Sequence, residues 1–272
     1  MLDRLARSSG ILVGGEITIN RVRPPLRRWR RAILLRVTLV LLTPIGLDAG
    51  CWERVPLPAV ATVKHVFPGF GGRPRALQQP TMASLADEVA ASYEGPLALA
   101  GVSLGGMVAQ HVALRHPARV RSLLVACTGA SADPATMAAR AANAEANGMT
   151  GVLGETLERW FTPAALALHP EHPGVAYARR TLLALQPACF ADGWRAIGGH
   201  DALARLGAIA VPTTCLAGSA DGASPVSRTR EISERVPGAR LVVLDGPHMM
   251  HLERPVEFAA ALSEHLRWAG EL

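Results

Sequence analysis

The sequence is poor in cysteine, and its cysteines are not arranged for a metal site or a disulfide framework. The 272 residues include four cysteines, none in a CxxC pair and none beside a histidine at metal-ligand spacing. They are Cys51, Cys127, Cys189 and Cys215. Tetrahedral zinc sites need clustered ligands, and disulfide scaffolds need paired cysteines. We therefore expect free thiols in a reducing compartment and no bound metal.

Beyond its first 36 residues the chain also lacks a surplus of positive charge. The formal net charge is +6, but residues 1–36 hold nine arginines against Asp3 and Glu16. Basic and acidic residues are nearly balanced in the remainder. A nucleic-acid-binding domain carries its basic residues as a patch or stripe on the folded body. We expect no nucleic-acid partner.

No apolar run in the sequence is long enough to cross a membrane. Residues 27–42 resemble a signal peptide, and the "LDAGC" that ends at Cys51 resembles a lipoprotein cleavage box. Arg36 interrupts the apolar run, whereas a bilayer span needs about 20 apolar residues. Cleavage before Cys51 would also remove a predicted strand over 36–44. We expect a leader over 1–36, no membrane partner and a cytoplasmic protein.

Strand-like and helix-like segments alternate along the rest of the chain, which is typical of an α/β fold with a mostly parallel sheet covered on both faces. Strands are expected at 16–23, 36–44, 61–67, 96–102, 120–129, 212–221 and 239–246. Helices are expected at 81–93, 104–116, 226–236 and 255–268. Residues 132–207 show helical patterns only. They are interpreted as a helical cap inserted into a core formed by 37–131 and 208–272.

One serine lies between two glycines where a predicted strand meets a predicted helix. Residues 101–105 read GVSLG and match G-x-S-x-G in the strand-turn-helix context that this motif requires. The sharp turn leaves no room for side chains two residues away from Ser103 on either side, hence the glycines. Ser103 is therefore the candidate nucleophile, and the backbone N–H of Leu104 is a candidate oxyanion donor.

A serine nucleophile needs a base, and the base needs a carboxylate that fixes its tautomer. In this fold class the acid follows the serine and the histidine comes last. Asp221 follows the predicted strand after the cap, in "LAGSADGASP". His248 lies in "LDGPHMMHLERP" after the last strand and is favoured over His251. Asp245 is a second candidate acid, interpreted as a turn residue.

The second oxyanion donor is expected after the strand that ends at Leu42. The loop there reads "TPIGLDAGCW", and Pro44 has no N–H to donate. The following residue, Ile45, keeps its N–H and is the candidate donor. The expected reaction is hydrolysis through an acyl-enzyme and needs no cofactor.

With these motifs in place, the chain resembles the α/β-hydrolase superfamily, and within it the 3-oxoadipate enol-lactonase group. The segments that carry the resemblance are "GVSLGGMVAQHVALRHPARVRSLLV", "GMTGVLGETLERWFTP", "AGSADGASP" and "GPHMMHLERPVEF". The resemblance implies an α/β-hydrolase fold and a serine hydrolase for a small ester or lactone. Phe67 departs from the family, which usually carries an aspartate there, and this leaves the substrate open.

The enol lactone of the resembling family carries a carboxylate, so the resemblance also implies an arginine in the pocket. Candidate pocket residues are Trp52, Arg159, Trp160, Arg179, Arg180, Trp194 and Arg195. Because fold does not fix chemistry, other activities of the scaffold stay open. These are a carboxylesterase, a C–C bond hydrolase, a perhydrolase or haloperoxidase, and a non-catalytic ligand-binding relative.

Overall fold

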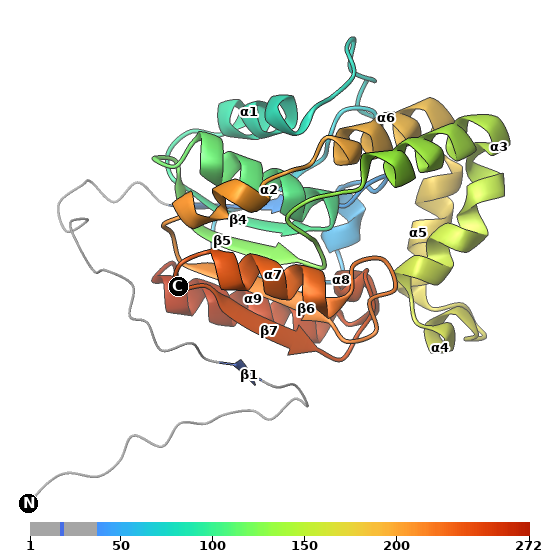
Figure 1. Cartoon of the computed structure of the whole chain (residues 1–272). Coiled ribbons are helices and arrows are strands. Elements are labelled where there is room, and N and C mark those ends of the chain that lie inside the picture. Colours follow the sequence, from blue (N-terminus) through green and yellow to red (C-terminus); the bar gives the residue numbers. More distant parts are fainter. Residues whose placement is uncertain (1–16, 19–36) are drawn as a thin grey trace, which may run out of the picture.

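A central sheet forms the middle of the molecule (Figure 1). The computed structural model describes residues 17–18 and 37–272. The sheet has seven strands in the order β1-β7-β6-β5-β4-β2-β3. Their bounds are β1 Ile17–Thr18, β2 Thr38–Leu42, β3 Thr62–His65, β4 Leu97–Val102, β5 Val120–Ala126, β6 Thr213–Gly218 and β7 Arg240–Leu244. All neighbours pair in parallel except β1 and β7. The α/β-hydrolase fold predicted from the sequence is confirmed.

The central strands are apolar because both of their faces are covered. Every residue of β4 and β6 is buried, as expected for parallel strands between two layers of helices. Helix α2 (Leu104–Arg115) packs against β4 and β5, and α7 (Val226–Arg235) packs against β6 and β7. Helix α9 (Pro255–Ala269) packs against β5 and β6. The remaining core helices are α1 Met82–Ser92, α8 Met250–Glu253, η1 Ala49–Trp52 and η2 Leu203–Ala208.

The strand order reverses at β2, and this reversal locates the site. β3 lies on one side of β2, while β4 lies on the other and leads on to β5, β6 and β7. The loops that follow β2 and β4 therefore diverge at the carboxyl edge of the sheet. In open α/β sheets such a switch point opens a crevice for ligands. Ile45 follows β2 and Ser103 follows β4, so both lie at this crevice.

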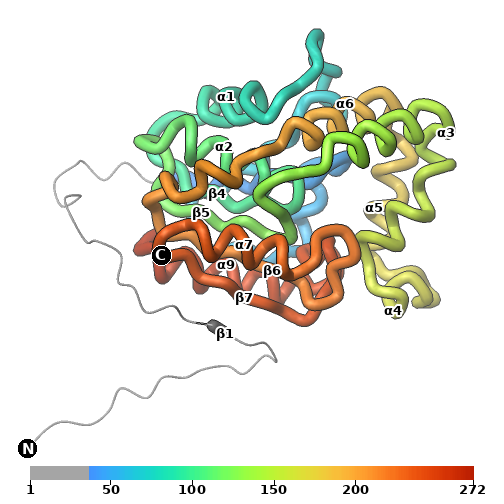
Figure 2. The backbone as a smooth tube through the Cα atoms, viewed as in Figure 1, coloured from blue at the N-terminus to red at the C-terminus, as the bar shows by residue number. Residues whose placement is uncertain are grey.

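Four α-helices occupy the chain between β5 and η2. They are α3 Pro134–Trp160, α4 Pro163–Leu166, α5 Pro173–Leu183 and α6 Pro187–Gly198. Gly148 interrupts the helical geometry of α3 with φ 64°, so this helix consists of two arms. The tube drawing shows α3, α4 and α5 at the opposite side of the molecule from the C terminus (Figure 2).

The two ends of this helical segment lie side by side. Ser131 and Asp201 form an isolated antiparallel bridge. Around it, the Ala132 N–H donates to the His200 carbonyl at 2.9 Å, and the Ala202 N–H donates to the Ala130 carbonyl at 2.8 Å. The segment thus leaves the sheet and returns to it at one place.

The N-terminal part of the chain contributes one short strand to the description. β1 pairs antiparallel with β7 through Ile17 and Val242. The remainder of the predicted 16–23 strand and of the 1–36 leader lies outside the described residues. Within the part of the chain that the structure describes, no helix is long and apolar enough to cross a membrane.

Candidate active site

Ser103 stands on a sharp turn between β4 and α2. Its φ of 54° and ψ of −116° place it outside the helix that begins at Leu104. A Cβ added to Gly101 would lie 2.3 Å from the carbonyl of Gly105, and one added to Gly105 would lie 2.2 Å from the carbonyl oxygen of Leu42. No side chain fits at either position. These contacts explain why the turn carries glycine on both sides of the serine.

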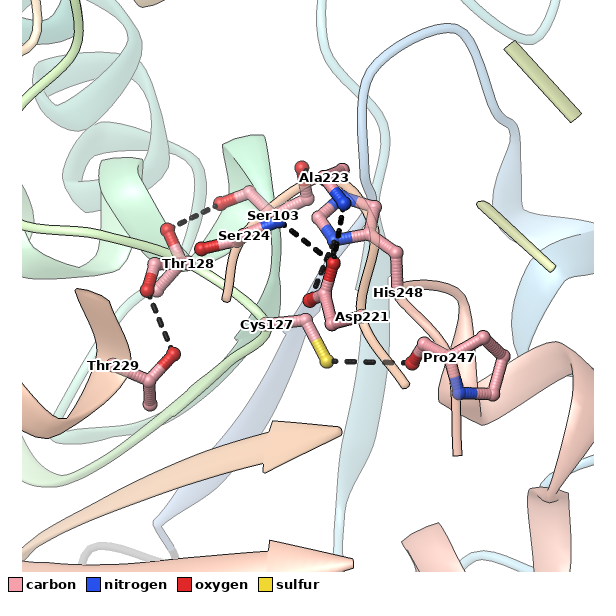
Figure 3. A network of polar contacts seen from close by, with 9 residues as sticks. All are labelled: Ser103, Cys127, Thr128, Asp221, Ala223, Ser224, Thr229, Pro247 and His248. Atoms are coloured by element: carbon pink, nitrogen blue, oxygen red, sulfur yellow. Dashed lines mark hydrogen bonds and ion pairs between the residues drawn. The ribbon is translucent and has the colours of Figure 1, made fainter. Parts of the chain in front are cut away.

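The His248 side chain connects Ser103 with Asp221 (Figure 3). Its Nε2 lies 3.0 Å from the Ser103 Oγ, and its Nδ1 lies 2.9 and 3.0 Å from the two Asp221 carboxylate oxygens. The three side chains follow β4, β6 and β7, whose carboxyl ends meet at one edge of the sheet. All three residues are buried, with at most 7% of their surface exposed. The geometry is that of a nucleophile, a base and an orienting acid.

The Asp221 carboxylate is fixed by backbone donors as well as by His248. The N–H groups of Ala223 and Ser224 donate to its Oδ1 at 2.8 and 2.7 Å. These two bonds hold the plane of the carboxylate. Asp221 therefore presents a fixed acceptor to the imidazole.

The two alternative residues lie apart from Ser103. The His251 side chain is fully buried, and its ring contacts the rings of Trp52 and Phe258 at centroid distances of 4.8 and 5.9 Å. Burial lowers its pKa to about 3, because the apolar surroundings disfavour the imidazolium. Asp245 accepts a hydrogen bond from the Ser219 hydroxyl at 3.2 Å. The structure brings His248 and Asp221 together with the serine, not His251 or Asp245.

Two threonines support the Ser103 turn, and nothing in the sequence singles them out. The Thr128 hydroxyl donates to the Ser103 carbonyl at 3.1 Å, and the Thr229 hydroxyl donates to the Thr128 carbonyl at 2.8 Å (Figure 3). Both threonines are completely buried. Thr128 follows β5 and Thr229 lies on α7, so only the packing of these elements shows that they meet.

Cys127 is a second feature beside the acid that the sequence does not indicate. It has φ 50°, in the left-handed region that non-glycine residues rarely adopt. Its thiol donates to the Pro247 carbonyl at 3.8 Å, directly before His248 (Figure 3). Burial, together with the nearby Asp221 carboxylate, raises the pKa of the Cys127 thiol. The thiol is therefore neutral and packs as a small apolar group.

A cavity of about 60 Å³ lies beside Ser103 and His248. Its walls come from the sheet edge and from α3 and α6. The large apolar side chains that line it are those of Ile45, Met107, Met137, Trp160, Trp194 and Ile197. Arg140 and Arg228 are the basic residues in its lining, and no acidic residue is among the described residues that line it.

Only some of the pocket residues expected from the sequence line this cavity. Trp160 and Trp194 line the cavity. Arg159 does not line it but lies 5.8 Å from the centre of the Trp194 ring. Arg195 is engaged with Glu145 at 2.6 Å.

Three expected pocket residues lie elsewhere, which corrects the sequence interpretation. Trp52 belongs to the aromatic cluster with His251. Arg179 pairs with Glu171 at 2.8 Å on an exposed face. Arg180 lies over the Tyr177 ring and faces a different, larger cavity. The exposed face of a cap helix depends on how the cap packs, which the sequence does not reveal.

The larger cavity, of about 600 Å³, is separate from the serine. It lies between the loop over 69–75 and helices α5 and α6. Arg75 there is paired with Asp192 at 2.6 Å, and Arg73 with Glu88 at 2.6 Å. Neither Ser103 nor His248 lines this cavity. The chemistry therefore points to the smaller cavity.

The two expected oxyanion donors both lie beside the serine. Ile45 lines the cavity with Ser103, and Leu104 is the first residue of α2. The amino end of a helix carries partial positive charge and exposed N–H groups, which favour a negative charge placed there. Among the described residues, no cluster of three or more His, Cys, Asp or Glu side chains could hold a metal ion.

The chain is similar to known proteins over most of its length. The alpha/beta hydrolase family matches residues 39–261 of the chain. The chain is 33% identical to the pimeloyl-[acyl-carrier protein] methyl ester esterase of Chromobacterium violaceum, over 84% of this chain and 93% of the relative. It is 26% identical to 3-oxoadipate enol-lactonase 1 of Acinetobacter baylyi, over 83% and 86%. Among solved structures, the enol-lactonase from Burkholderia xenovorans LB400 has a TM-score of 0.79 at 23% identity, covering 93% and 95%.

Proposed function

The chain belongs to the alpha/beta hydrolase family, and we propose that it is a serine hydrolase that cleaves a small carboxylic ester or lactone. The observation that carries the proposal is the pair of hydrogen bonds at His248, 3.0 Å to the Ser103 Oγ and 2.9 Å to Asp221. The esterases and lactonases among its relatives support the type of bond cleaved. Proposed roles are nucleophile for Ser103, base for His248 and orienting acid for Asp221.

Asp221 determines which nitrogen of His248 carries the proton. A carboxylate only accepts hydrogen bonds, so the Nδ1 next to it carries the hydrogen. The Nε2 then presents its lone pair to the Ser103 hydroxyl. As the Ser103 Oγ attacks the substrate carbonyl, its proton passes to Nε2, and the nearby carboxylate stabilises the imidazolium.

The carbonyl oxygen gains a negative charge when the tetrahedral intermediate forms. We propose that the backbone N–H groups of Ile45 and Leu104 stabilise this charge, aided by the amino end of α2. When the intermediate collapses, the C–O bond breaks and Nε2 returns its proton to the leaving alkoxide. A water, deprotonated by the same nitrogen, then attacks the acyl-enzyme and releases the acid and free Ser103. In a lactone, alcohol and acid remain in one product.

We propose that residues 132–207 form a cap that closes the site and selects the substrate. A cavity of about 60 Å³ is much smaller than the ~300–1,000 Å³ of most ligand pockets. This size favours a small acyl group or lactone ring in the conformation described. A longer acyl group, such as that in the name of the 33% identical esterase, would require α3 and α6 to separate.

The test of the serine mechanism is labelling with a fluorophosphonate probe. Wild type should be labelled on Ser103, and Ser103→Ala should not. Ser227→Ala, which removes an exposed hydroxyl on α7, is the matched control and should label like wild type. Labelling that persists in Ser103→Ala, or its absence in wild type, would contradict the proposal. Asp221→Asn should keep Ser103 but lower kcat by about 10³- to 10⁴-fold, because the imidazole tautomer is no longer fixed.

The substrate class requires a separate panel of compounds. The panel contains short methyl esters, small lactones and a methyl ester of a carrier-linked acyl chain. It shows which of these substrate classes the protein hydrolyses with the highest kcat/KM. We expect a higher kcat/KM for the short esters or lactones than for the carrier-linked ester. A clear preference for the carrier-linked ester would replace the small-substrate proposal while leaving the serine mechanism in place.

A further inference from the structure

The loop after β2, over residues 43–48, carries the Ile45 N–H that we propose as an oxyanion donor. Four of its residues form a turn in which the Leu47 N–H donates to the Pro44 carbonyl at 3.4 Å. The second residue of such a turn donates no hydrogen bond within it, and in the described part of the chain the Ile45 N–H has no acceptor. The direction of this N–H therefore depends on what holds the loop from outside.

Helices α5 and α6 pack closely against this loop. A Cβ added to Gly193 of α6 would lie 2.9 Å from the Ile45 Cδ1, so the Ile45 side chain lies directly on the backbone of the helix. A Cβ added to Gly46 would lie 3.0 Å from the Leu182 side chain of α5 and 3.0 Å from the Phe190 ring of α6. Two consecutive residues of the loop thus rest on the two helices, with no room for a further methyl group.

A hydrogen bond fixes the end of the same loop to α5. The Tyr177 hydroxyl donates to the Asp48 Oδ1 at 2.6 Å, and this oxygen also accepts from the Gly50 N–H at 2.8 Å. Burial raises the pKa of Tyr177, because desolvation disfavours the phenolate, and the bond to Asp48 acts in the same direction. The hydroxyl therefore keeps its proton and donates it to the carboxylate.

The loop separates the two cavities of the molecule. Ile45 lines the cavity that contains the serine, whereas Gly46 and Asp48 line the larger cavity of about 600 Å³. The larger cavity leaves space beside the loop, so packing on that side does not fix it. The bond from Tyr177 to Asp48 joins the loop to α5 at this side.

We propose that Tyr177, acting through Asp48, positions the Ile45 N–H for the tetrahedral intermediate, so that the oxyanion hole is complete only while α5 and α6 pack on the loop. This inference rests on the proposed serine mechanism. Tyr177 is a positioning residue, because it is not among the described residues that line the cavity of the serine. The other proposed donor, the Leu104 N–H, begins α2 and does not depend on these helices. Loss of the bond from Tyr177 should therefore weaken one of two donors.

The experiment removes the Tyr177 hydroxyl and measures the reaction per active site. Hydrolysis of para-nitrophenyl acetate is compared in wild type and Tyr177→Phe, with active sites counted by fluorophosphonate titration. Loss of a whole oxyanion donor lowers kcat by about 10²- to 10³-fold, so a displaced donor should lower it by about tenfold, with KM changed by less than about twofold. Ethyl trifluoromethyl ketone, which forms a tetrahedral adduct with a serine, should bind about tenfold more weakly, because it needs the same donors.

Arg179→Met is the matched control, since it removes a polar contact from the exposed face of the same helix. It should leave kcat, KM and the affinity for the ketone unchanged. Unchanged kcat and ketone affinity in Tyr177→Phe would overturn the inference. So would fewer titratable sites at an unchanged kcat per site, which would indicate a merely structural role, or a change confined to KM.

Variants of Asp48 test whether Tyr177 acts through this carboxylate. Asp48→Asn keeps an oxygen that accepts both hydrogen bonds and should retain at least about a third of the wild-type kcat. Asp48→Ala should lose at least as much as Tyr177→Phe. The double variant Tyr177→Phe/Asp48→Ala should be no slower than Asp48→Ala alone, because both changes remove one contact. Losses that multiply would overturn the inference and leave the serine mechanism standing, whereas a wild type that is not labelled by the fluorophosphonate would contradict the serine mechanism itself.

Discussion

The Glu253 carboxylate accepts two hydrogen bonds from Thr162, one from its N–H at 3.0 Å and one from its hydroxyl at 2.7 Å. Thr162 follows α3, and Glu253 lies five residues after His248. A second hydrogen bond joins the same two segments, from the Met249 N–H to the Trp160 carbonyl at 2.9 Å. The loop that carries the histidine is therefore attached to the helices that cover the cavity.

Glu253→Gln should weaken this attachment. Its carboxylate is buried, and an amide in its place would point an N–H₂ group at one of the two donors of Thr162. We expect the free energy of unfolding to fall by about 1–3 kcal/mol. Urea denaturation measures the change, with the exposed Glu264→Gln as control. If both variants had the stability of wild type, the contact would have no stabilising role.

Thr128→Val should impair the reaction more than the fold. Valine fills the same volume but removes the hydroxyl that donates to the Ser103 carbonyl at 3.1 Å. The loss of one buried hydrogen bond costs about 1 kcal/mol of stability. Because the bond holds the backbone of the proposed nucleophile, we expect kcat and the rate of fluorophosphonate labelling to fall by about tenfold, at nearly constant KM. Unchanged labelling kinetics would show that α2 alone holds the turn.

Two glycine substitutions should have opposite effects on stability. Gly105→Ala places a methyl group 2.2 Å from the Leu42 carbonyl oxygen, which is backbone and cannot move aside cheaply. We expect a loss of about 3 kcal/mol or more, because the core there is overpacked. Gly154→Ala, on an exposed turn of α3 with no neighbour within 4 Å, should stabilise by about 0.5–1 kcal/mol. Thermal melts of the two variants measure both effects, and shifts of the melting temperature in the same direction would contradict the expectation.

A buried histidine pair should make the protein sensitive to acid. The His200 Nε2–H donates to the Gly129 carbonyl at 3.0 Å, so its Nδ1 accepts from the Nε2–H of His111 at 3.1 Å. Burial lowers the pKa of His200 to about 4, against an ordinary value of 6.5. The unfolded chain therefore binds a proton between about pH 6.5 and 4 that the folded protein does not bind. The contribution of the neutral His200 to the free energy of unfolding is fully present above pH 6.5 and decreases as the pH falls through this window.

His200→Gln removes the group that binds this proton in the unfolded chain. Whatever its stability at neutral pH, the variant should lose less free energy of unfolding than wild type between pH 7 and 5. Denaturant unfolding at several pH values gives the two slopes. Equal slopes would mean that other groups account for the acid sensitivity.

The sequence predicts the fold and the order of the three central residues because their signals are local. A glycine on each side of Ser103, a turn after an apolar strand at Asp221 and a Gly-Pro before His248 are each visible within a few residues. Because neighbouring strands are parallel, their carboxyl ends lie at one edge of the sheet. No long-range sequence signal is needed to predict that the three residues meet there. The structure places the three side chains within hydrogen-bonding distance, and their catalytic roles stay a proposal.

The walls of the cavity could not be predicted in the same way. Arg140 and Arg179 both lie on amphipathic helices, and nothing in their neighbourhoods says which helix turns its arginine inward. That depends on the kink at Gly148 and on the packing of α3 against α6. Trp52 was expected in the pocket, but its ring is enclosed by residues of α8 and α9 that lie about 200 positions later in the sequence. Long-range contacts of this kind leave no local pattern.

The bridge between Ser131 and Asp201 has a consequence for how such a chain diversifies. Because the four helices begin and end at adjacent backbone positions, the strands on either side keep their spacing whatever loop or helix set joins them. An exchange of the whole segment for one of different length would leave the Ser103 turn, Asp221 and His248 on an unchanged frame. Under the roles proposed above, the residues that cleave the bond and the cap that selects the substrate would then lie on separable pieces of one polypeptide.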